Sequence, residues 1–220
     1  MCGSTRSFGS GQSDAFAIRL NANGDTLWTK LYGSTRNDVF NSVVVVPSGG
    51  FVMVGYASQP NGYNDIYIVK TDANGNIIWQ KAFGTLAISD YASVVKTTPD
   101  GGFIVGGTSY INSYTSYVVI KLSSTGSVEW SSSYIGPNTS GNSLSDLIVE
   151  NDGSIVAVGN YSDIDETGII NFKLDSDGAI VWKRNYRQAN VDLNGRAVVA
   201  IPGGGYLLAG YSENDGGKFI

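Results

Sequence analysis

Two stretches decide the fold: SVVVVPSGGFVMVGYAS at 42–58 and DIYIVKTDANGNIIWQKAF at 65–83. Each contains two runs of β-branched and aromatic residues, separated by a segment rich in Gly, Asn, Asp or Pro. Apolar runs of about four to eight residues bounded in this way are typical of β-strands. The separating segments at 47–50 and 72–75 are typical of tight hairpin turns, because Asn and Gly adopt positive φ angles at little cost. The two stretches therefore predict four antiparallel strands.

The same pattern recurs along the chain at a nearly constant period. Successive tryptophans are 51, 51 and 52 residues apart, with a glycine four residues before each and a basic residue nine residues before each. A second glycine series at positions 3, 55, 107, 159 and 210 has nearly the same spacing. These columns indicate tandem units of roughly 52 residues. The tryptophans are Trp28, Trp79, Trp130 and Trp182, the turn glycines Gly24, Gly75, Gly126 and Gly178, and the basic residues Arg19, Lys70, Lys121 and Lys173.

Four antiparallel strands in each unit are the pattern of a β-propeller blade. We therefore expect an all-β fold with almost no helix, built as a β-propeller of four-stranded antiparallel blades. A single repeat array over 1–220 contains about four blade equivalents. Three units are complete and two are partial. Their ranges are 1–33 (partial), 34–83, 84–135, 136–186 and 187–220 (partial).

The two partial units leave two arrangements open. Residues 14–33 supply third and fourth strands, and 195–212 supply first and second strands, so together they could close a four-bladed ring. They could equally belong to neighbouring blades of a longer propeller. We favour the fragment of a longer array, because residues 217–220 would duplicate the strand at 14–20. A fragment would also explain why no secretion signal stands at the amino end.

Composition excludes several classes of function. The net charge is −5 and the basic residues are scattered singly, so we expect no nucleic-acid partner. No apolar run is long enough for a membrane span. The chain has no histidine and one cysteine, Cys2, which excludes imidazole chemistry and an internal disulfide. We therefore expect no catalytic residues, no cofactor and no metal site.

The Asp-x-Asx-Gly turns at 72–75 and 175–178 resemble the start of a calcium-binding loop. An EF-hand loop ends in a bidentate glutamate at its twelfth position. The twelfth residues here are Phe83 and Tyr186, neither of which supplies such a ligand. The sequence thus favours simple hairpin turns.

Three columns of side chains are candidates for a site. We interpret the tryptophans as packing residues between blades, because a large aromatic ring once per unit buries a large area. The basic residues are expected to pair with Asp14 and Asp65, five residues before their column, or to face solvent. A column of tyrosines after the second strand could provide ligand-binding aromatic rings in loops. These tyrosines are Tyr56, Tyr110, Tyr161 and Tyr211.

Four segments carry a resemblance to a known repeat: 76–81 (NIIWQK), 90–95 (DYASVV), 100–105 (DGGFIV) and 118–122 (VVIKL). They resemble a family of bacterial propeller repeats found in secreted and surface lipoproteins, often ahead of a carboxy-terminal sorting domain. The resemblance implies a propeller fold and a parent protein that is extracellular or attached to the cell surface.

A further segment, LDSDGAIVW at 174–182, is similar to the repeat of quinone-dependent dehydrogenases and of their non-catalytic relatives. The quinone enzymes need a calcium site, a catalytic carboxylate and commonly vicinal cysteines, and a lone cysteine excludes the last of these.

Two classes of function follow. The first is a non-enzymatic secreted or cell-surface propeller that binds a protein or a glycan, or serves as a scaffold. The alternative is a fragment of a propeller enzyme, hydrolase or quinoprotein-like, whose catalytic residues lie outside this chain. An attached catalytic domain would favour the enzyme, whereas further repeats and a sorting domain would favour the binding module.

Overall fold

Strands account for 67% of the described residues, which contain no helix. The computed structural model describes residues 1–7, 9–47, 49–85, 87–111, 114–136, 141–162 and 167–213. The predicted all-β class is therefore confirmed. Within these ranges there is also no helix that is long and apolar enough to cross a membrane. The chain divides into two compact units, Met1–Thr97 and Thr98–Ile220, which are described in turn.

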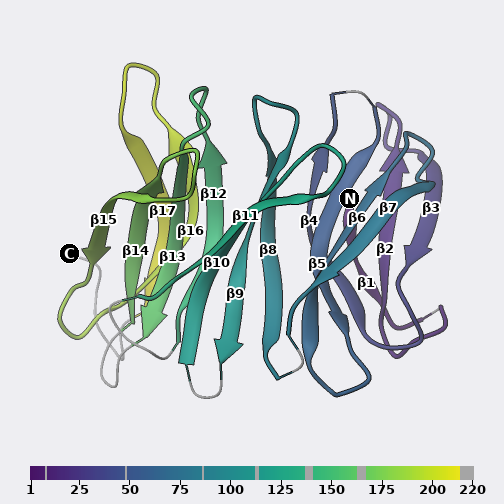
Figure 1. Ribbon diagram of the computed structural model, residues 1–220, viewed down its shortest axis with the longest axis horizontal. Coiled ribbons are helices and arrows are strands. Elements are labelled where there is room, and N and C mark those ends of the chain that lie inside the picture. The colour runs from purple at the N-terminus through teal and green to yellow at the C-terminus, as the bar shows by residue number, and fades with distance from the viewer. Residues whose placement is uncertain are drawn as a thin grey trace. The chain divides into compact units, whose positions relative to one another are not determined.

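The first unit contains two antiparallel sheets and one further strand (Figure 1). A three-stranded sheet has the order β1-β2-β3, and a four-stranded sheet has the order β4-β5-β6-β7. The strands are β1 (Cys2–Thr5), β2 (Asp14–Leu20), β3 (Thr26–Tyr32), β4 (Asp38–Val45), β5 (Phe51–Ser58), β6 (Asn64–Thr71), β7 (Ile77–Phe83) and β8 (Ser89–Thr97). The four-stranded sheet corresponds to the complete unit predicted at 34–83.

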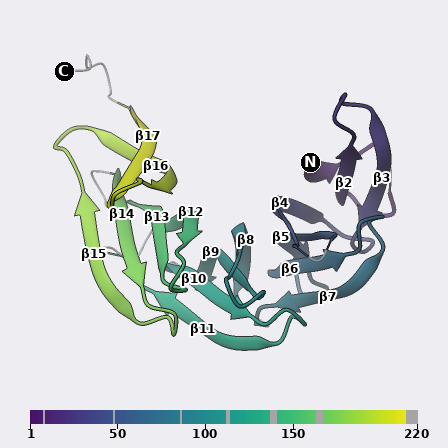
Figure 2. The same cartoon turned by 90° about the horizontal axis from the view of Figure 1, so that it is seen from above.

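The second unit continues the same series. Strand β10 pairs with both β9 and β11, β12–β15 form a four-stranded sheet in chain order, and β16–β17 form a two-stranded sheet (Figure 2). The strands are β9 (Phe103–Ile111), β10 (Tyr114–Leu122), β11 (Val128–Tyr134), β12 (Ser143–Val149), β13 (Ile155–Ser162), β14 (Thr167–Leu174), β15 (Ile180–Tyr186), β16 (Asp192–Ala200) and β17 (Tyr206–Glu213). No sheet among the described residues is closed on itself.

The predicted repeat appears as a repeated strand register. Every tryptophan lies on the last strand of its series and stands opposite the basic residue of its unit, and a register shift follows at once. These pairs are Arg19–Trp28, Lys70–Trp79, Lys121–Trp130 and Lys173–Trp182. Equivalent positions for the four tryptophans are thus confirmed. The partial units at 14–33 and 195–212 lie in different sheets, and residues 217–220 fall outside the described ranges.

The predicted hairpin turns form where Asn-Gly and related pairs stand. Gly24, Gly75, Gly126 and Gly178 have φ angles of 87°, 76°, 80° and 86°, which side chains rarely tolerate. In the turn at 72–75, Asp72 Oδ1 accepts hydrogen bonds of 2.8 Å from the backbone N–H groups of Asn74 and Asn76. The aspartate of this turn therefore satisfies the local backbone, as the hairpin interpretation requires.

Aromatic and aliphatic side chains pack between successive sheets. In the first unit, Phe40 stacks on Tyr67 with ring centroids 5.7 Å apart, and Met53 is fully buried in the same cluster. In the second unit, the fully buried rings of Tyr117 and Phe172 lie 5.7 Å apart. Such contacts hold neighbouring sheets together by burying apolar area.

Candidate binding pocket

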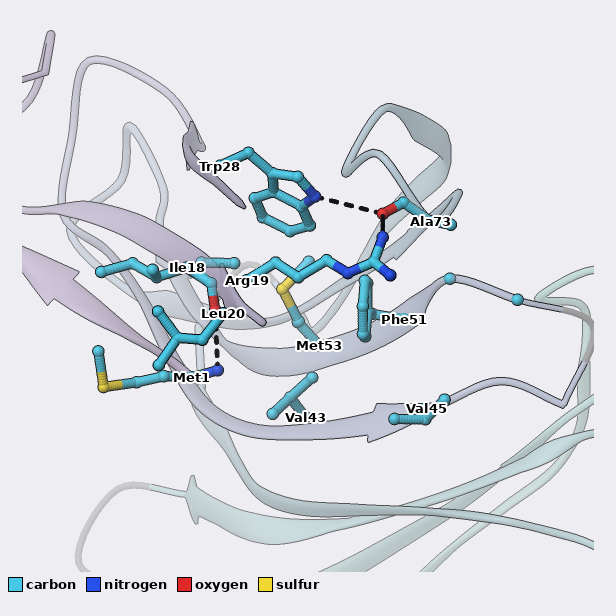
Figure 3. A pocket seen from close by; sticks show the side chains of 13 residues that line it. Met1, Ile18, Arg19, Leu20, Trp28, Val43, Val45, Phe51, Met53 and Ala73 are labelled. Carbon is cyan, nitrogen blue, oxygen red and sulfur yellow. Dashed lines mark hydrogen bonds between the residues drawn. The ribbon is translucent and has the colours of Figure 1, made fainter. Parts of the chain in front are cut away.

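A pocket of about 460 Å³ opens in the first unit, between the β2–β3 hairpin and strands β4 and β5 (Figure 3). Strand β1 pairs with β2 from Thr5 opposite Asp14 to Cys2 opposite Ala17, and Met1 exchanges backbone hydrogen bonds with Ile18.

The walls of the pocket are mostly apolar. The Trp28 and Phe51 rings meet edge to face, with centroids 5.9 Å apart, and the buried Met53 lies beside them. Around the opening, Leu20 and Val45 remain 45% and 66% exposed. An apolar surface that is concave and still open to water is suited to bind an apolar group.

One polar feature limits the pocket on the side of the β6–β7 turn. The Arg19 guanidinium donates a hydrogen bond of 2.7 Å to the carbonyl oxygen of Ala73, and the Trp28 indole N–H donates one of 3.2 Å to the same oxygen (Figure 3). This arrangement fixes a positive charge beside the apolar walls. The guanidinium has further N–H groups with which it can bind a carboxylate.

The expected pairing of Arg19 with Asp14, five residues earlier, is wrong. Arg19 binds a backbone carbonyl, while Asp14 accepts backbone N–H groups of Ser10 and Gly11. The buried Lys121 forms ion pairs with Asp100 at 2.7 Å and Glu129 at 3.1 Å, and its hydrogen bond lowers the pKa of Asp100 to about 2. Lys173 pairs with Glu150 and likewise lowers the pKa of that carboxyl. The partners come from adjacent strands and turns, which chain spacing does not predict.

The tyrosine column lies within strands β5, β9, β13 and β17 and not in loops. Tyr161 is only 5% exposed, so its ring is not available to a ligand. Tyr56 packs edge to face on Tyr91, with centroids 4.9 Å apart. Tyr211 is 42% exposed and lies under the Arg196 guanidinium, which is 5.2 Å from the ring centroid. Tyr110 is 46% exposed. The structure thus distributes this column over separate sheets.

Sequence reasoning missed a contact that we call the latch, formed by a tryptophan, the tyrosine four residues after it and a later hairpin turn. In the first unit, Trp28 Nε1 donates to Ala73 O at 3.2 Å and Tyr32 Oη to Gly75 O at 2.9 Å. The second unit repeats it: Trp130 donates to Ser176 O and Tyr134 to Gly178 O. These bonds join Trp28 and Trp130 to the β6–β7 turn and the β14–β15 turn. A tyrosine four residues after the tryptophan was the available sequence signal.

The described part of the chain contains no group of three or more Cys, Asp or Glu side chains arranged to hold a metal ion. Comparison with known proteins adds no assignment. No protein-family model matches the chain, and no curated protein matches it in sequence.

Proposed function

We propose that the protein is a non-enzymatic β-propeller module, secreted or on the cell surface, that binds proteins by accepting an extended apolar segment in the pocket of the first unit. The observation that carries the proposal is the apolar pocket in which the Trp28 and Phe51 rings meet beside the Arg19 guanidinium. The resemblance to surface propeller repeats supports the location, and the repeated strand register supports the propeller.

An extended segment can place several apolar side chains along this site, because alternate side chains of such a segment enter pockets beside it. The apolar side chains would contact Val43, Val45 and Phe51, which line the pocket on β4 and β5. Arg19 favours a segment that carries a carboxylate.

The test is calorimetric titration of the chain with the peptide TVEVTV, acetylated and amidated, and with TVKVTV as the charge control. We expect the glutamate peptide to bind more tightly. Val45→Glu places a charge at the pocket opening and should weaken binding about tenfold, or ~1.4 kcal/mol. Ile78→Glu is the matched control, because Ile78 is a similarly exposed apolar residue, 58% exposed, away from the pocket. Absence of binding, or equal losses in the two variants, would contradict the proposal.

A glycan is the second candidate ligand, and a hollow of the same unit with amide and carboxylate side chains in its lining favours it. Gln59, Asn61, Asp65 and Thr85 line a hollow of about 570 Å³, and Tyr63, 39% exposed, belongs to the adjoining turn. Amide and carboxylate groups beside an exposed aromatic ring can bind sugar hydroxyls and a sugar face. A glycan array should then show signals that Tyr63→Ala removes. An array without signals would exclude this candidate.

A further inference from the structure

Two aspartates of the first unit are buried side by side. Asp14 begins β2 and is 4% exposed, and Asp38 begins β4 and is 1% exposed. The residues before them, Ser13 and Asn37, form a parallel bridge, and the backbone N–H of Asp38 donates a hydrogen bond of 2.7 Å to Ser13 O. Residues that follow such a bridged pair are again opposite each other, about 4.8 Å apart and on the same face. In agreement with this proximity, burial and then the charge of Asp14 raise the pKa of Asp38.

Within the described residues, no lysine or arginine neutralises this pair. Asp14 accepts the backbone N–H groups of Ser10 and Gly11 at 3.2 Å. Asp38 Oδ2 accepts the backbone N–H of Ser34 at 2.7 Å and its hydroxyl at 3.1 Å. The other oxygen, Asp38 Oδ1, is buried and has no hydrogen-bond partner among the described residues. A buried carboxylate oxygen without a partner costs free energy, so this oxygen points to a ligand that these residues do not supply.

The repeat shows how the same positions are filled where the aspartate pair is absent. Positions 14, 65 and 116 are 51 residues apart, and 38, 90 and 142 are 52 residues apart, so Ser116 and Asn142 are the equivalent residues of the second unit. Asn142 is 1% exposed, as Asp38 is. Its Nδ2 donates to Thr115 O at 2.7 Å, and its Oδ1 accepts the Tyr117 hydroxyl at 3.0 Å. A neutral amide at this position is thus satisfied by the chain alone, whereas Asp38 is not.

We propose that Asp14 and Asp38 together bind a hard divalent cation, for which calcium is the probe. Calcium takes oxygen ligands at about 2.3–2.6 Å, so one ion can bridge two carboxylates that are about 4.8 Å apart. Asp38 Oδ1 supplies an oxygen that no N–H group of the described residues occupies, and the two charges of the ion neutralise the pair.

The surroundings allow an ion to enter this site. Ser10 and Ser34, whose backbone N–H groups contact the two carboxylates, are themselves exposed, so water can reach the site and complete the coordination. Two carboxylates are fewer acidic ligands than a sensor loop provides. We therefore expect a dissociation constant of about 10⁻⁴–10⁻³ M, the range of extracellular calcium-binding modules.

Thermal unfolding of the full chain in EDTA, and then in calcium chloride at constant ionic strength, tests the site. The wild-type midpoint should rise by about 5 °C at about 10 mM calcium, because an ion that binds only the folded chain stabilises it by mass action. Asp38→Asn reproduces the residue at 142 and should abolish the rise, and Asp14→Ser, which reproduces the residue at 116, should do the same. Asp90→Asn is the matched control, because Asp90 is the repeat equivalent of Asp38 in the same unit and is 8% exposed. It should keep the rise.

Calorimetric titration with calcium chloride measures binding directly and should show it for the wild type but not for Asp38→Asn. A wild-type midpoint that calcium does not move would overturn the proposal, as would an undiminished rise in both Asp38→Asn and Asp14→Ser. Loss of the rise in Asp90→Asn as well would show that the response does not belong to the pair of Asp14 and Asp38, which also overturns it. A midpoint that ignores calcium but increases in Asp38→Asn would show two carboxylates that repel each other without an ion, and would likewise overturn the site.

Discussion

The hydroxyl of Tyr32 donates a hydrogen bond of 2.9 Å to the carbonyl oxygen of Gly75, 43 residues later in the chain. Tyr134 makes the same contact with Gly178, 44 residues later. Each bond joins the last strand of one series to a turn of the next sheet. The latch thus adds hydrogen bonds to the apolar contacts between these hairpins.

Removing the hydroxyl should weaken this coupling. Tyr32→Phe keeps the ring but leaves the Gly75 carbonyl without its donor, and we expect the free energy of unfolding to fall by about 1 kcal/mol. Urea unfolding followed by circular dichroism would measure the loss. Phe83 stands at the equivalent position of another repeat, so the ring itself fits this register. A variant as stable as wild type would show that the bond adds nothing to stability.

Two glycines with the same turn geometry should respond differently to alanine. Gly75→Ala and Gly24→Ala both place a side chain at positive φ, which costs about 1 kcal/mol. At Gly75 the added Cβ also approaches Trp28 and Tyr32 to 3.0 and 3.1 Å, whereas at Gly24 it meets nothing. Gly75→Ala should therefore lower the free energy of unfolding more than Gly24→Ala does. Because both variants carry the same backbone strain, the difference between their thermal midpoints measures the effect of the contacts in the latch. Equal midpoints would contradict this account.

Alkaline pH should destabilise the fold through its buried tyrosines. Burial, with Asp72 as a second cause, raises the pKa of Tyr32 to about 12, and burial with Asp38 raises the pKa of Tyr67 to about 12. The folded chain then holds protons that the unfolded chain releases near pH 10, so the free energy of unfolding decreases as pH rises from about 10 to 12. Unfolding midpoints measured across this range should fall, and Tyr67→Phe should make the decrease shallower. An unchanged slope in the variant would exclude Tyr67 as a source.

The ion pair of Lys173 and Glu150 should make the free energy of unfolding depend on pH in the acidic range. The hydrogen bond from Lys173 lowers the pKa of Glu150 from 4.5, so its stabilisation is present above pH 4.5 and is lost as pH falls through the lowered pKa. The pKa of Lys173 is raised from 10.5, so the pair persists until strongly alkaline pH. Lys173→Met should cost about 1 kcal/mol at pH 7 and less at pH 3. The exposed Lys183→Met is the control, and a pH-independent loss in Lys173→Met would point to packing instead of charge.

Fold class, strand positions and turns were predictable from the sequence because they depend on near neighbours in the chain. The runs on either side of 72–75 alternate as strands do, and glycine at positions such as Gly75 is required by φ alone. The constant spacing of the tryptophans predicted their common register, and the structure confirms it.

The partners of the basic column were not predictable in this way. Arg19 was expected to pair with Asp14, five positions earlier, but in a strand such a residue lies on the opposite face and about 17 Å away along the strand. Lys121 pairs with Asp100, which lies in the turn before the neighbouring strand β9 and is brought beside Lys121 by strand pairing. The exposure of the rings in the tyrosine column was also not predictable from their position in the repeat. One sequence position gives a buried ring at Tyr161 and an exposed one at Tyr211, because their neighbouring sheets differ.

The sequence by itself determined an all-β chain with a period of roughly 52 residues and hairpins at fixed glycines, since hydrophobic alternation and backbone conformation are properties of adjacent residues. Only the tertiary structure decided which groups meet across sheets. Trp28 reaches the carbonyl oxygen of Ala73 across 45 residues, and Arg19 reaches the same oxygen across 54 residues. Those contacts depend on which turn packs over which ring. The order of neighbouring residues does not determine them.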